Sequence, residues 1–318
     1  STNSYCFVYI FSMKHIELKH NSTFETACSY YMRSKSFCAL TVATQKKYIS
    51  NLKVACNTKV QGNKILATTP VKDIRYAHLQ VAYDVWLDKG TRSANYIATN
   101  VSIVLNDCIR HSIIPQNLMA LVPKLKCKPR RTLWTHDQVK LFLDTAYSDF
   151  KWRSIGLICH ILYESGQRVG DIRLLKWDSL DLEAQRMDIH QNKRGVDVHL
   201  FIGDTLTKVL YKQREEYDGL SEYVAPRTVA RAGIYSHYKE DEISKLFKQI
   251  KVEVNLPDEL QARDLRRTAV VEMSEVGVDW IGIKQVTGHQ SHQSLVPYLV
   301  NTFSGAKDAQ ERRRNGKK

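Results

Sequence analysis

The C-terminal half of the chain carries residues whose types suit chemistry at an anion. In chain order they are Arg168 shortly after Gly166, Lys193, the pair Arg263-x-x-Arg266, and Gly288-His289 followed nine residues later by Tyr298. Guanidinium groups stay charged and hold two oxygens of a phosphate at once. A tyrosine hydroxyl offers an oxygen nucleophile. The set therefore suits a reaction at a phosphate group.

Each of these residues has an ordinary structural alternative when it is considered alone. The alternatives are a surface arginine for Arg168, a solvated turn residue for Lys193, a capping or core histidine for His289 and a core tyrosine for Tyr298. Order, spacing and predicted placement nevertheless agree, at five points along the chain, with the pattern of a family that the sequence resembles and that is described below. That joint agreement favours the functional interpretation.

The segment that precedes Arg168 is predicted to be helical. Thr135 and Gln138 have the spacing of a capping box, which predicts that a helix starts there. A second predicted helix runs from about Trp152 and stops near Gly166. Arg168 is therefore expected directly after the end of a helix.

Lys193 lies in a predicted β-hairpin. Hydrophobic and polar residues alternate over 187–189 and again over 196–202, which is the period of a strand. The four residues 192–195 (NKRG) have the composition of a hairpin turn. From about Asp204 onward the pattern is again helical, to the end of the chain.

The same residues, in the same order, resemble the tyrosine recombinases, a family that includes phage integrases and Xer-type resolvases. The family has an arginine after a helix-ending glycine, a lysine on a hairpin, an H-x-x-R box, a G-H pair and a tyrosine nine residues later. The phrases YESGQRVGDIRLLKW, DLRRTA and TGHQSHQSLVPYL are also similar to the family's. The resemblance covers roughly residues 130–300 strongly, and the preceding helical region by position and pattern. It implies a mainly α fold with a small antiparallel β-sheet (α+β).

The resemblance implies an enzyme that cleaves and rejoins DNA at specific sites through a 3′-phosphotyrosine intermediate. It assigns the nucleophile to Tyr298, phosphate binding to Arg168 and Arg266, proton donation to the leaving 5′ oxygen to Lys193, and a hydrogen bond to the scissile phosphate to His289. No metal and no cofactor are expected.

One position departs from the family pattern, because Arg263 stands where the H-x-x-R box usually has histidine. An arginine side chain does not deprotonate at working pH, so it cannot accept the proton of the tyrosine. Either Arg263 only adds positive charge near the phosphate, or another group takes the proton. His289, His292 and water are the candidates, and reduced or differently pH-dependent activity is expected.

Two neighbours of the catalytic candidates carry further predictions. Asp171 lies three residues after Arg168, where the family commonly has an acidic residue, and is expected to orient an arginine. Pro297 precedes Tyr298, and proline is unusual inside a helix. Tyr298 is therefore predicted at the start or kink of a helix.

Composition favours a polyanionic partner in a globular protein. The 318-residue chain has a formal net charge of +14, from 47 Lys and Arg against 33 Asp and Glu, which points to nucleic acid. The seven scattered cysteines form no C-x-x-C pair, so neither a zinc site nor a disulfide framework is predicted. This pattern predicts a reducing, intracellular compartment. No apolar run approaches the length of a membrane span.

The predicted domain organisation separates two parts at a basic linker. The expected segments are an N-terminal lead or arm at 1–20, a helical core-binding domain at 21–122, the linker at 123–131, a catalytic domain at 132–300 and an exchange segment or tail at 301–318. The predicted DNA-binding residues are Lys124, Lys126, Lys128, Arg130 and Arg131 of the linker, and Lys46 and Lys47 of the helical domain.

The resemblance also suggests a biological setting. It implies a homo-tetramer on two duplexes of double-stranded DNA, with accessory DNA-bending or directionality proteins as further partners, in the cytoplasm or nucleoid of a bacterial host. About 23 residues precede the first predicted helix, so a full arm-binding domain is not expected. Integration or excision of a phage or mobile element is the favoured role. The alternatives are a Xer-like resolvase, a type IB topoisomerase and, in a different class, a catalytically inactive DNA-binding protein.

Overall fold

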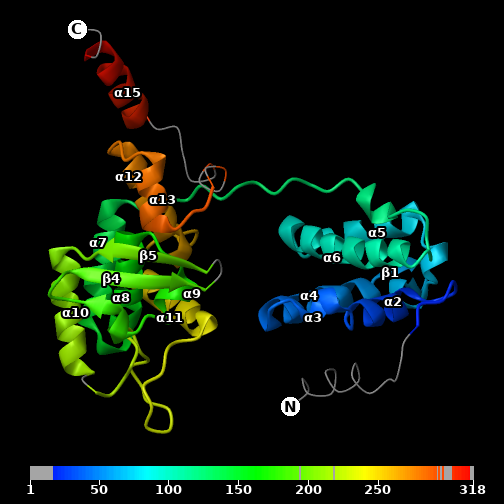
Figure 1. The fold of residues 1–318 in the computed structure, drawn as a ribbon, viewed down its shortest axis with the longest axis horizontal. Helices are drawn as coiled ribbons and strands as arrows, with labels where there is room; N and C mark the ends of the chain where they lie inside the picture. The colour runs from blue at the N-terminus through cyan, green and yellow to red at the C-terminus, as the bar shows by residue number, and fades with distance from the viewer. Residues whose placement is uncertain are drawn as a thin grey trace. The chain divides into compact units, whose positions relative to one another are not determined.

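The computed structural model describes residues 17–192, 195–217, 219–291, 293, 296 and 303–315 (Figure 1). The chain divides into two compact units, Ser1–Lys128 and Pro129–Lys318, each with its own hydrophobic core. The division falls inside the predicted linker. Over the described ranges, no helix combines the length and the apolar character needed to cross a membrane.

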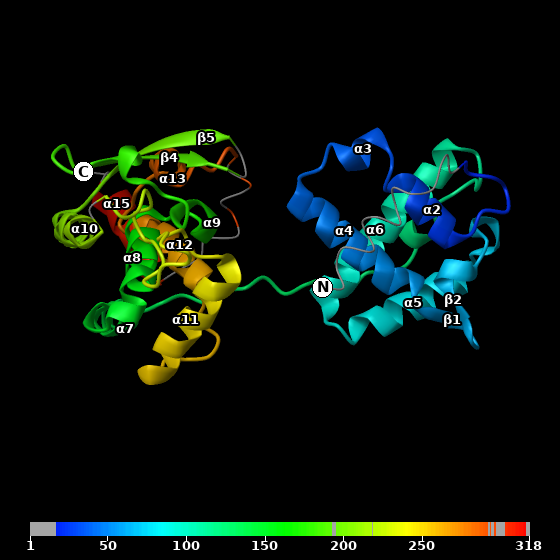
Figure 2. The same cartoon turned by 90° about the horizontal axis from the view of Figure 1, so that it is seen from below.

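The first unit is mainly helical. Its elements are α2 (Phe24–Tyr31), α3 (Lys35–Cys38), α4 (Val42–Cys56), β1 (Lys59–Gln61), β2 (Lys64–Ile65), η1 (Leu66–Thr68), η2 (Val71–Asp73), α5 (Tyr76–Leu87), α6 (Thr91–Arg110) and η3 (Leu118–Ala120). Helix α6 contacts α2, α4 and α5 (Figure 2). Its apolar side chains from Ile97 to Cys108 recur at helical spacing and are buried, which explains its central place.

The first unit, predicted as a helical domain at 21–122, also contains a short pair of strands that was not predicted. Strands β1 and β2 pair in antiparallel fashion between α4 and α5. The two residues between them are Gly62 and Asn63. Gly62 has a φ of +52°, and a tight turn between strands requires such a positive φ, which glycine adopts readily. The segment is too short for its strand alternation to stand out against the flanking helical pattern.

The second unit packs helices around a small sheet. Its elements are α7 (His136–Ser148), α8 (Phe150–Ser165), α9 (Val169–Ile172), η4 (Trp177–Ser179), β3 (Leu180–Asp181), β4 (Arg186–Gln191), β5 (Val196–Phe201), α10 (Asp204–Glu216), α11 (Glu240–Glu253), α12 (Ala262–Glu275), α13 (Trp280–Thr287) and α15 (Phe303–Asn315). This agrees with the predicted α+β class.

Helix α8 lies in the middle of the second unit and contacts α7, α10, α11 and α12. Residues 154–162 of α8 are all buried, so the helix is apolar on nearly every side. It ends at Gly166, whose φ of +60° stops the helix in the left-handed conformation that glycine adopts most readily. The prediction that Arg168 follows a helix end is confirmed, as is the capping box of Thr135 and Gln138.

The sheet of the second unit has the order β3-β4-β5, with both pairs antiparallel. In its register Met187 faces Leu200, Ile189 faces Val198, and Gln191 faces Val196. Met187, Ile189 and Gln191 alternate on the buried side of β4. A polar amide therefore occupies the last buried position before the turn. The predicted hairpin is confirmed, while Lys193 in its turn lies outside the described residues.

Two further predictions differ from the structure or fall outside it. Helical pattern was expected from Asp204 onward, but the described residues between α10 and α11 form a loop with isolated bridges such as Pro226–His237. Glycine and proline interrupt the helix there.

At the C-terminal end, α15 contacts α12 of the same chain, with Arg312 against Gly277. The lead predicted at 1–20 falls almost wholly outside the described part of the chain.

Candidate active site

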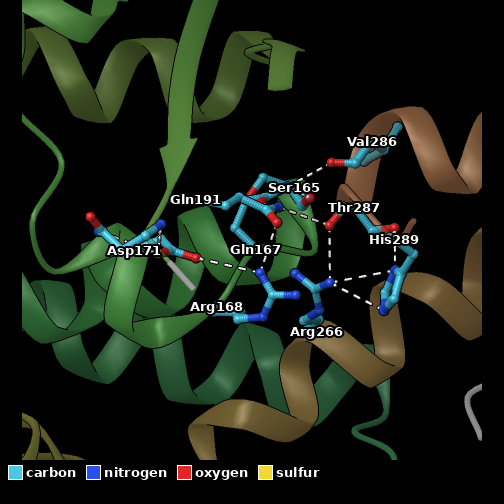
Figure 3. Close-up of polar contacts among 10 residues, drawn as sticks. Ser165, Gln167, Arg168, Asp171, Gln191, Arg266, Val286, Thr287 and His289 are labelled. Carbon is cyan, nitrogen blue, oxygen red and sulfur yellow. Dashed lines mark hydrogen bonds and ion pairs between the residues drawn. The ribbon is translucent and has the colours of Figure 1, made fainter. Parts of the chain in front are cut away.

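Three of the predicted catalytic residues meet in one cluster, although they come from distant parts of the sequence (Figure 3). Arg168 caps the start of α9, Arg266 lies in the second turn of α12, and His289 follows the end of α13. Arg266 and His289 are buried, with 5% and 3% of their surface exposed, and the Arg168 side chain is 24% exposed. The cluster thus presents one partly open arginine backed by two buried groups.

A short path of hydrogen bonds joins the two arginines. Arg168 Nη1 donates to Gln191 Oε1 at 2.8 Å, and Gln191 Nε2 donates to the carbonyl oxygen of Thr287 at 2.9 Å. The same carbonyl accepts from Arg266 Nη2 at 3.0 Å. Figure 3 shows the path as a row of dashed lines between the two guanidinium groups. Their separation is therefore fixed by one amide and one carbonyl.

His289 is held by the same segment. Its Nδ1 lies 2.5 Å from Thr287 Oγ1, and that hydroxyl donates to the Ile283 carbonyl at 2.6 Å. Because the hydroxyl proton is used on Ile283, the Thr287 oxygen accepts from His289 Nδ1–H. The neutral ring then carries its proton on Nδ1, and Nε2, which lies 3.3 Å from Arg266 Nη2, is the acceptor.

Asp171 links Arg168 to the hairpin. One carboxylate oxygen lies 3.7 Å from Arg168 Nη1, and the other accepts from the backbone N–H of Asn192 at 3.1 Å. The Asp171 side chain is only 4% exposed. The carboxylate therefore lies where the sequence predicted, beside an arginine, and in addition it anchors the residue that precedes Lys193.

Arg263 lies apart from the buried cluster. It is exposed in the first turn of α12 and lines a surface groove of about 630 Å³ together with Val169, the residue after Arg168. Glu240 and Lys248 line the same groove. The side chain thus adds positive charge beside the segment that carries Arg168, on the surface rather than in the cluster.

Replacing Arg263 with histidine is expected to change the pH dependence of DNA cleavage. A histidine accepts a proton only when it is neutral, so cleavage by Arg263→His should rise with pH through about 6–7 and then level off. Wild type should lack the part of the rise that position 263 contributes, because an arginine does not lose its proton in this range. Single-turnover cleavage rates measured from pH 5 to 9 compare the two. If their profiles coincide, position 263 has no part in proton transfer.

The predicted linker is partly docked rather than extended over its whole length. In the first unit the Leu125 carbonyl accepts from Asn95 Nδ2 at 2.9 Å. In the second unit Arg130 forms two hydrogen bonds with the carboxylate of Asp264, at 2.7 and 2.6 Å, and one with the Glu259 carbonyl. The hydrogen bond to Asp264 raises the pKa of Arg130. Arg130, predicted as a DNA contact, thus has a structural partner at the start of α12.

Removing the Arg130 guanidinium is expected to destabilise the second unit. Asp264 is 3% exposed at its side chain, and removing the cation of a buried pair is unfavourable by roughly 3 kcal/mol at the low end, which applies here because Arg130 itself is 28% exposed. Denaturant unfolding of Arg130→Ala measures the loss. Its exposed neighbour is the matched control, since Arg131→Ala should change stability little. Equal effects of the two substitutions would show that the ion pair contributes nothing.

The other predicted DNA-binding residues are all exposed. They are Lys124, Lys126, Lys128 and Arg131 of the linker, and Lys46 and Lys47 on α4. Exposed cationic side chains are available to phosphates, and the contact itself stays a prediction. Lys193, His292, Pro297 and Tyr298 lie outside the described residues, so the structure leaves their predicted placement untested.

Sequence reasoning missed the polar residues that hold the cluster together. Gln167 Nε2 donates to the Val286 carbonyl at 2.6 Å, and Gln167 Oε1 accepts from Gln191 Nε2 at 2.7 Å. Both glutamines are fully buried. Gln191 could have been found, because it is a polar residue at a core position of an alternating strand. Gln167 gives no such signal, since it lies in a short connection.

A family model described as "Phage integrase family" matches residues 133–304, which is more than half of the chain. The chain belongs to this family. The match includes every catalytic candidate from Arg168 to Tyr298. A search of curated proteins finds no significant match.

Solved structures share the fold across both units. A lambda integrase dimer bound to a COC′ core site is 20% identical, with a TM-score of 0.73, over 88% of this chain and 78% of that one. A lambda integrase tetramer bound to a Holliday junction is 19% identical, with a TM-score of 0.71, over 90% and 85%. The Tn1549 transposon integrase with transposon right end DNA is 14% identical, with a TM-score of 0.75, over 92% and 99%.

Membership of the phage integrase family makes the chain a site-specific recombinase of the tyrosine class. The fold of lambda integrase and of the Tn1549 integrase agrees with this. The topoisomerase and resolvase alternatives are not favoured. The hydrogen-bonded cluster of Arg168, Arg266 and His289 lies in the matched region. The roles of individual residues follow as proposals.

Proposed function

We propose that this integrase cleaves and rejoins DNA through a 3′-phosphotyrosine bond to Tyr298, in the integration or excision of a phage or other mobile element. The observation that carries the proposal is the convergence of Arg168, Arg266 and His289 in one hydrogen-bonded cluster. Apolar contacts such as that of Val270 with Ile283 also join α12 and α13, but a buried arginine and histidine add nothing to such packing and are unfavourable unless they are paired.

The two guanidinium groups bind the non-bridging oxygens of the scissile phosphate. These oxygens gain negative charge as the nucleophile approaches, so fixed cations stabilise the transition state more than the ground state. Burial strengthens the effect, since Arg266 lies in a region with little water to screen it. Arg168, which is more exposed, offers the open side on which DNA enters.

The reaction exchanges one phosphodiester for another. The Tyr298 oxygen attacks phosphorus, the bond from phosphorus to the 5′ oxygen breaks, and the 5′ strand leaves as a hydroxyl that takes a proton from Lys193. The tyrosine proton goes to His289, to His292 or to water. Attack by a 5′ hydroxyl from another strand reverses these steps and releases the tyrosine. No oxidation occurs, and the phosphotyrosine bond retains the energy for rejoining.

Double-stranded DNA is the proposed partner, and a tetramer on two duplexes the proposed assembly. Lambda integrase is similar in fold and was solved with a core site and, as a tetramer, with a Holliday junction. The net charge of +14 and the exposed linker lysines of this chain suit the phosphates of a duplex. Helix α15 is then the segment that neighbouring subunits would exchange, and the proposed setting is a bacterial cytoplasm or nucleoid.

A suicide DNA substrate tests the proposed function. A nick placed shortly 3′ of the cleavage site lets the short fragment that bears the new 5′ hydroxyl diffuse away, so a covalent protein–DNA adduct accumulates. Candidate sites come from the DNA junctions that flank the gene. We expect the protein on the 3′ phosphate, so that a label 5′ of the cut stays with the protein and a label 3′ of it is released. Strand cleavage without any adduct would contradict the proposal.

Substitution of Lys193 is expected to affect only the departure of the 5′ oxygen. Loss of a general acid should slow cleavage of ordinary DNA by Lys193→Ala about 10²–10⁴-fold. A substrate with sulfur in place of the bridging 5′ oxygen should restore most of the rate, because a thiolate leaves without a proton. Gel-resolved single-turnover cleavage measures both rates. An equal defect on the two substrates would assign Lys193 a different role.

A further inference from the structure

We propose that Gln191 is a positioning residue that sets the distance between the two phosphate-binding arginines. This inference rests on the proposed roles of Arg168 and Arg266. Gln191 is completely buried at the end of β4, two residues before Lys193 in the sequence. It is the only group among the described residues that hydrogen-bonds both Arg168 and the carbonyl held by Arg266.

Both polar atoms of the Gln191 amide form hydrogen bonds. Its oxygen accepts from Arg168 at 2.8 Å, while its nitrogen donates to Gln167 Oε1 at 2.7 Å and to the Thr287 carbonyl at 2.9 Å. The partners fix the orientation, since an arginine can only donate and a carbonyl can only accept. A flipped amide would place its nitrogen against the guanidinium. The side chain thus has one orientation, and it constrains Arg168 to one position.

A neutral amide is the residue type that this position requires. A glutamate would accept from Arg168 equally well, but its negative charge would compete with the phosphate for the guanidinium. It would also lose both donated hydrogen bonds. A methionine of similar length would fill the space and make none of the three contacts. Glutamine holds the arginine while leaving its full positive charge for the substrate.

The backbone at Gly288 is shaped around this amide. A Cβ atom at position 288 would come within 3 Å of three atoms of the Gln191 amide, and Gly288 has a φ of +68°. The glycine of the G-H pair therefore serves two needs: the left-handed helix end and the close approach of Gln191. In this way the hairpin touches the segment that carries His289.

Substitution of Gln191 tests the inference with substrates of different charge. The variant Gln191→Met should cleave a normal suicide substrate on the order of 10²-fold more slowly than wild type, because a small displacement of a catalytic group has an effect of that size. DNA affinity should be unchanged. A substrate with a neutral methylphosphonate at the cleaved position lacks one negative charge, so its transition state depends less on the positive charge of the two arginines. On it, the defects of Gln191→Met and of Arg168→Ala should both shrink to within about tenfold.

Two further variants separate positioning from folding. Gln185→Met is the matched control, because Gln185, just before β4, also donates to a carbonyl, that of Ile202 just after β5, but does not hydrogen-bond an arginine. It should cleave both substrates at the wild-type rate. Gln191→Glu should cleave the normal substrate more slowly than Gln191→Met does, because its charge competes with the phosphate for Arg168. If the methionine variant does not fold, the glutamate variant tests the role of Gln191 in its place. Melting temperatures of all variants report the folded fraction.

The outcomes distinguish the inference from the function on which it rests. A wild-type rate for Gln191→Met on the normal substrate, with Arg168→Ala slow, would overturn the role of Gln191 alone. Equal defects of Gln191→Met on the charged and neutral substrates would do the same, because they indicate a merely structural role. A wild-type rate for Arg168→Ala would overturn the proposed function and this inference together.

Discussion

Replacement of Tyr298 with phenylalanine is expected to abolish the covalent protein–DNA adduct while leaving DNA binding within about twofold of wild type. The substitution removes one oxygen atom, and without that nucleophile no phosphotyrosine bond can form. The arginines and His289 remain, so the phosphate is still bound. Denaturing gels of the suicide-substrate reaction measure the adduct, and a binding titration at fixed salt measures affinity.

The chain contains 16 tyrosines, so a matched control is needed. Tyr211 is partly exposed on α10, outside the cluster, and Tyr211→Phe should form adduct at the wild-type rate. An adduct that persists in Tyr298→Phe would place the nucleophile elsewhere in the chain.

Loss of the Arg266 guanidinium is expected to slow cleavage by about 10³-fold, the size of effect seen when one fixed donor to a transition-state oxygen is removed. Arg266→Lys should recover little of this rate. A lysine keeps the charge but cannot bind the phosphate with two donors while also donating to the Thr287 carbonyl. Single-turnover cleavage rates at saturating enzyme measure both variants.

Because Arg266 is buried, its substitution also affects stability, and melting temperatures must accompany the rates. Arg186→Ala is the control, since Arg186 lies exposed at the start of β4 and pairs with Asp188 at 2.9 Å. It should cleave normally. An Arg266→Ala protein that is folded and cleaves within tenfold of wild type would contradict the proposed phosphate clamp.

Local signals predicted most of the elements that carry the site. The capping box at Thr135, the helix end at Gly166 and the strand alternation on both sides of Lys193 each depend on residues close together in the sequence. Such signals act through backbone hydrogen bonds and glycine conformation, which neighbouring residues determine. The structure confirms the helix start, the helix end and the hairpin strands.

The connections within the site could not be predicted in the same way. Gln191 and Thr287 lie 96 residues apart, and only the folded chain brings the amide to the carbonyl. The partner of Arg130 is still more distant in the sequence, 134 residues away at Asp264. In the sequence Arg130 is one more basic residue in PKLKCKPRR, and nothing local separates it from its exposed neighbour Arg131. Long-range pairing, rather than residue type, decides these roles.

The identity of the nucleophile is tested most directly by locating the DNA on the protein. Trypsin cuts after Lys284 and Lys307, and the peptide between those cuts contains Tyr298 as its single tyrosine. After nuclease and trypsin digestion of the covalent adduct, mass spectrometry should find the residual 3′-linked nucleotide on that peptide, with fragment ions that assign it to Tyr298. A nucleotide on any other peptide would contradict the central claim.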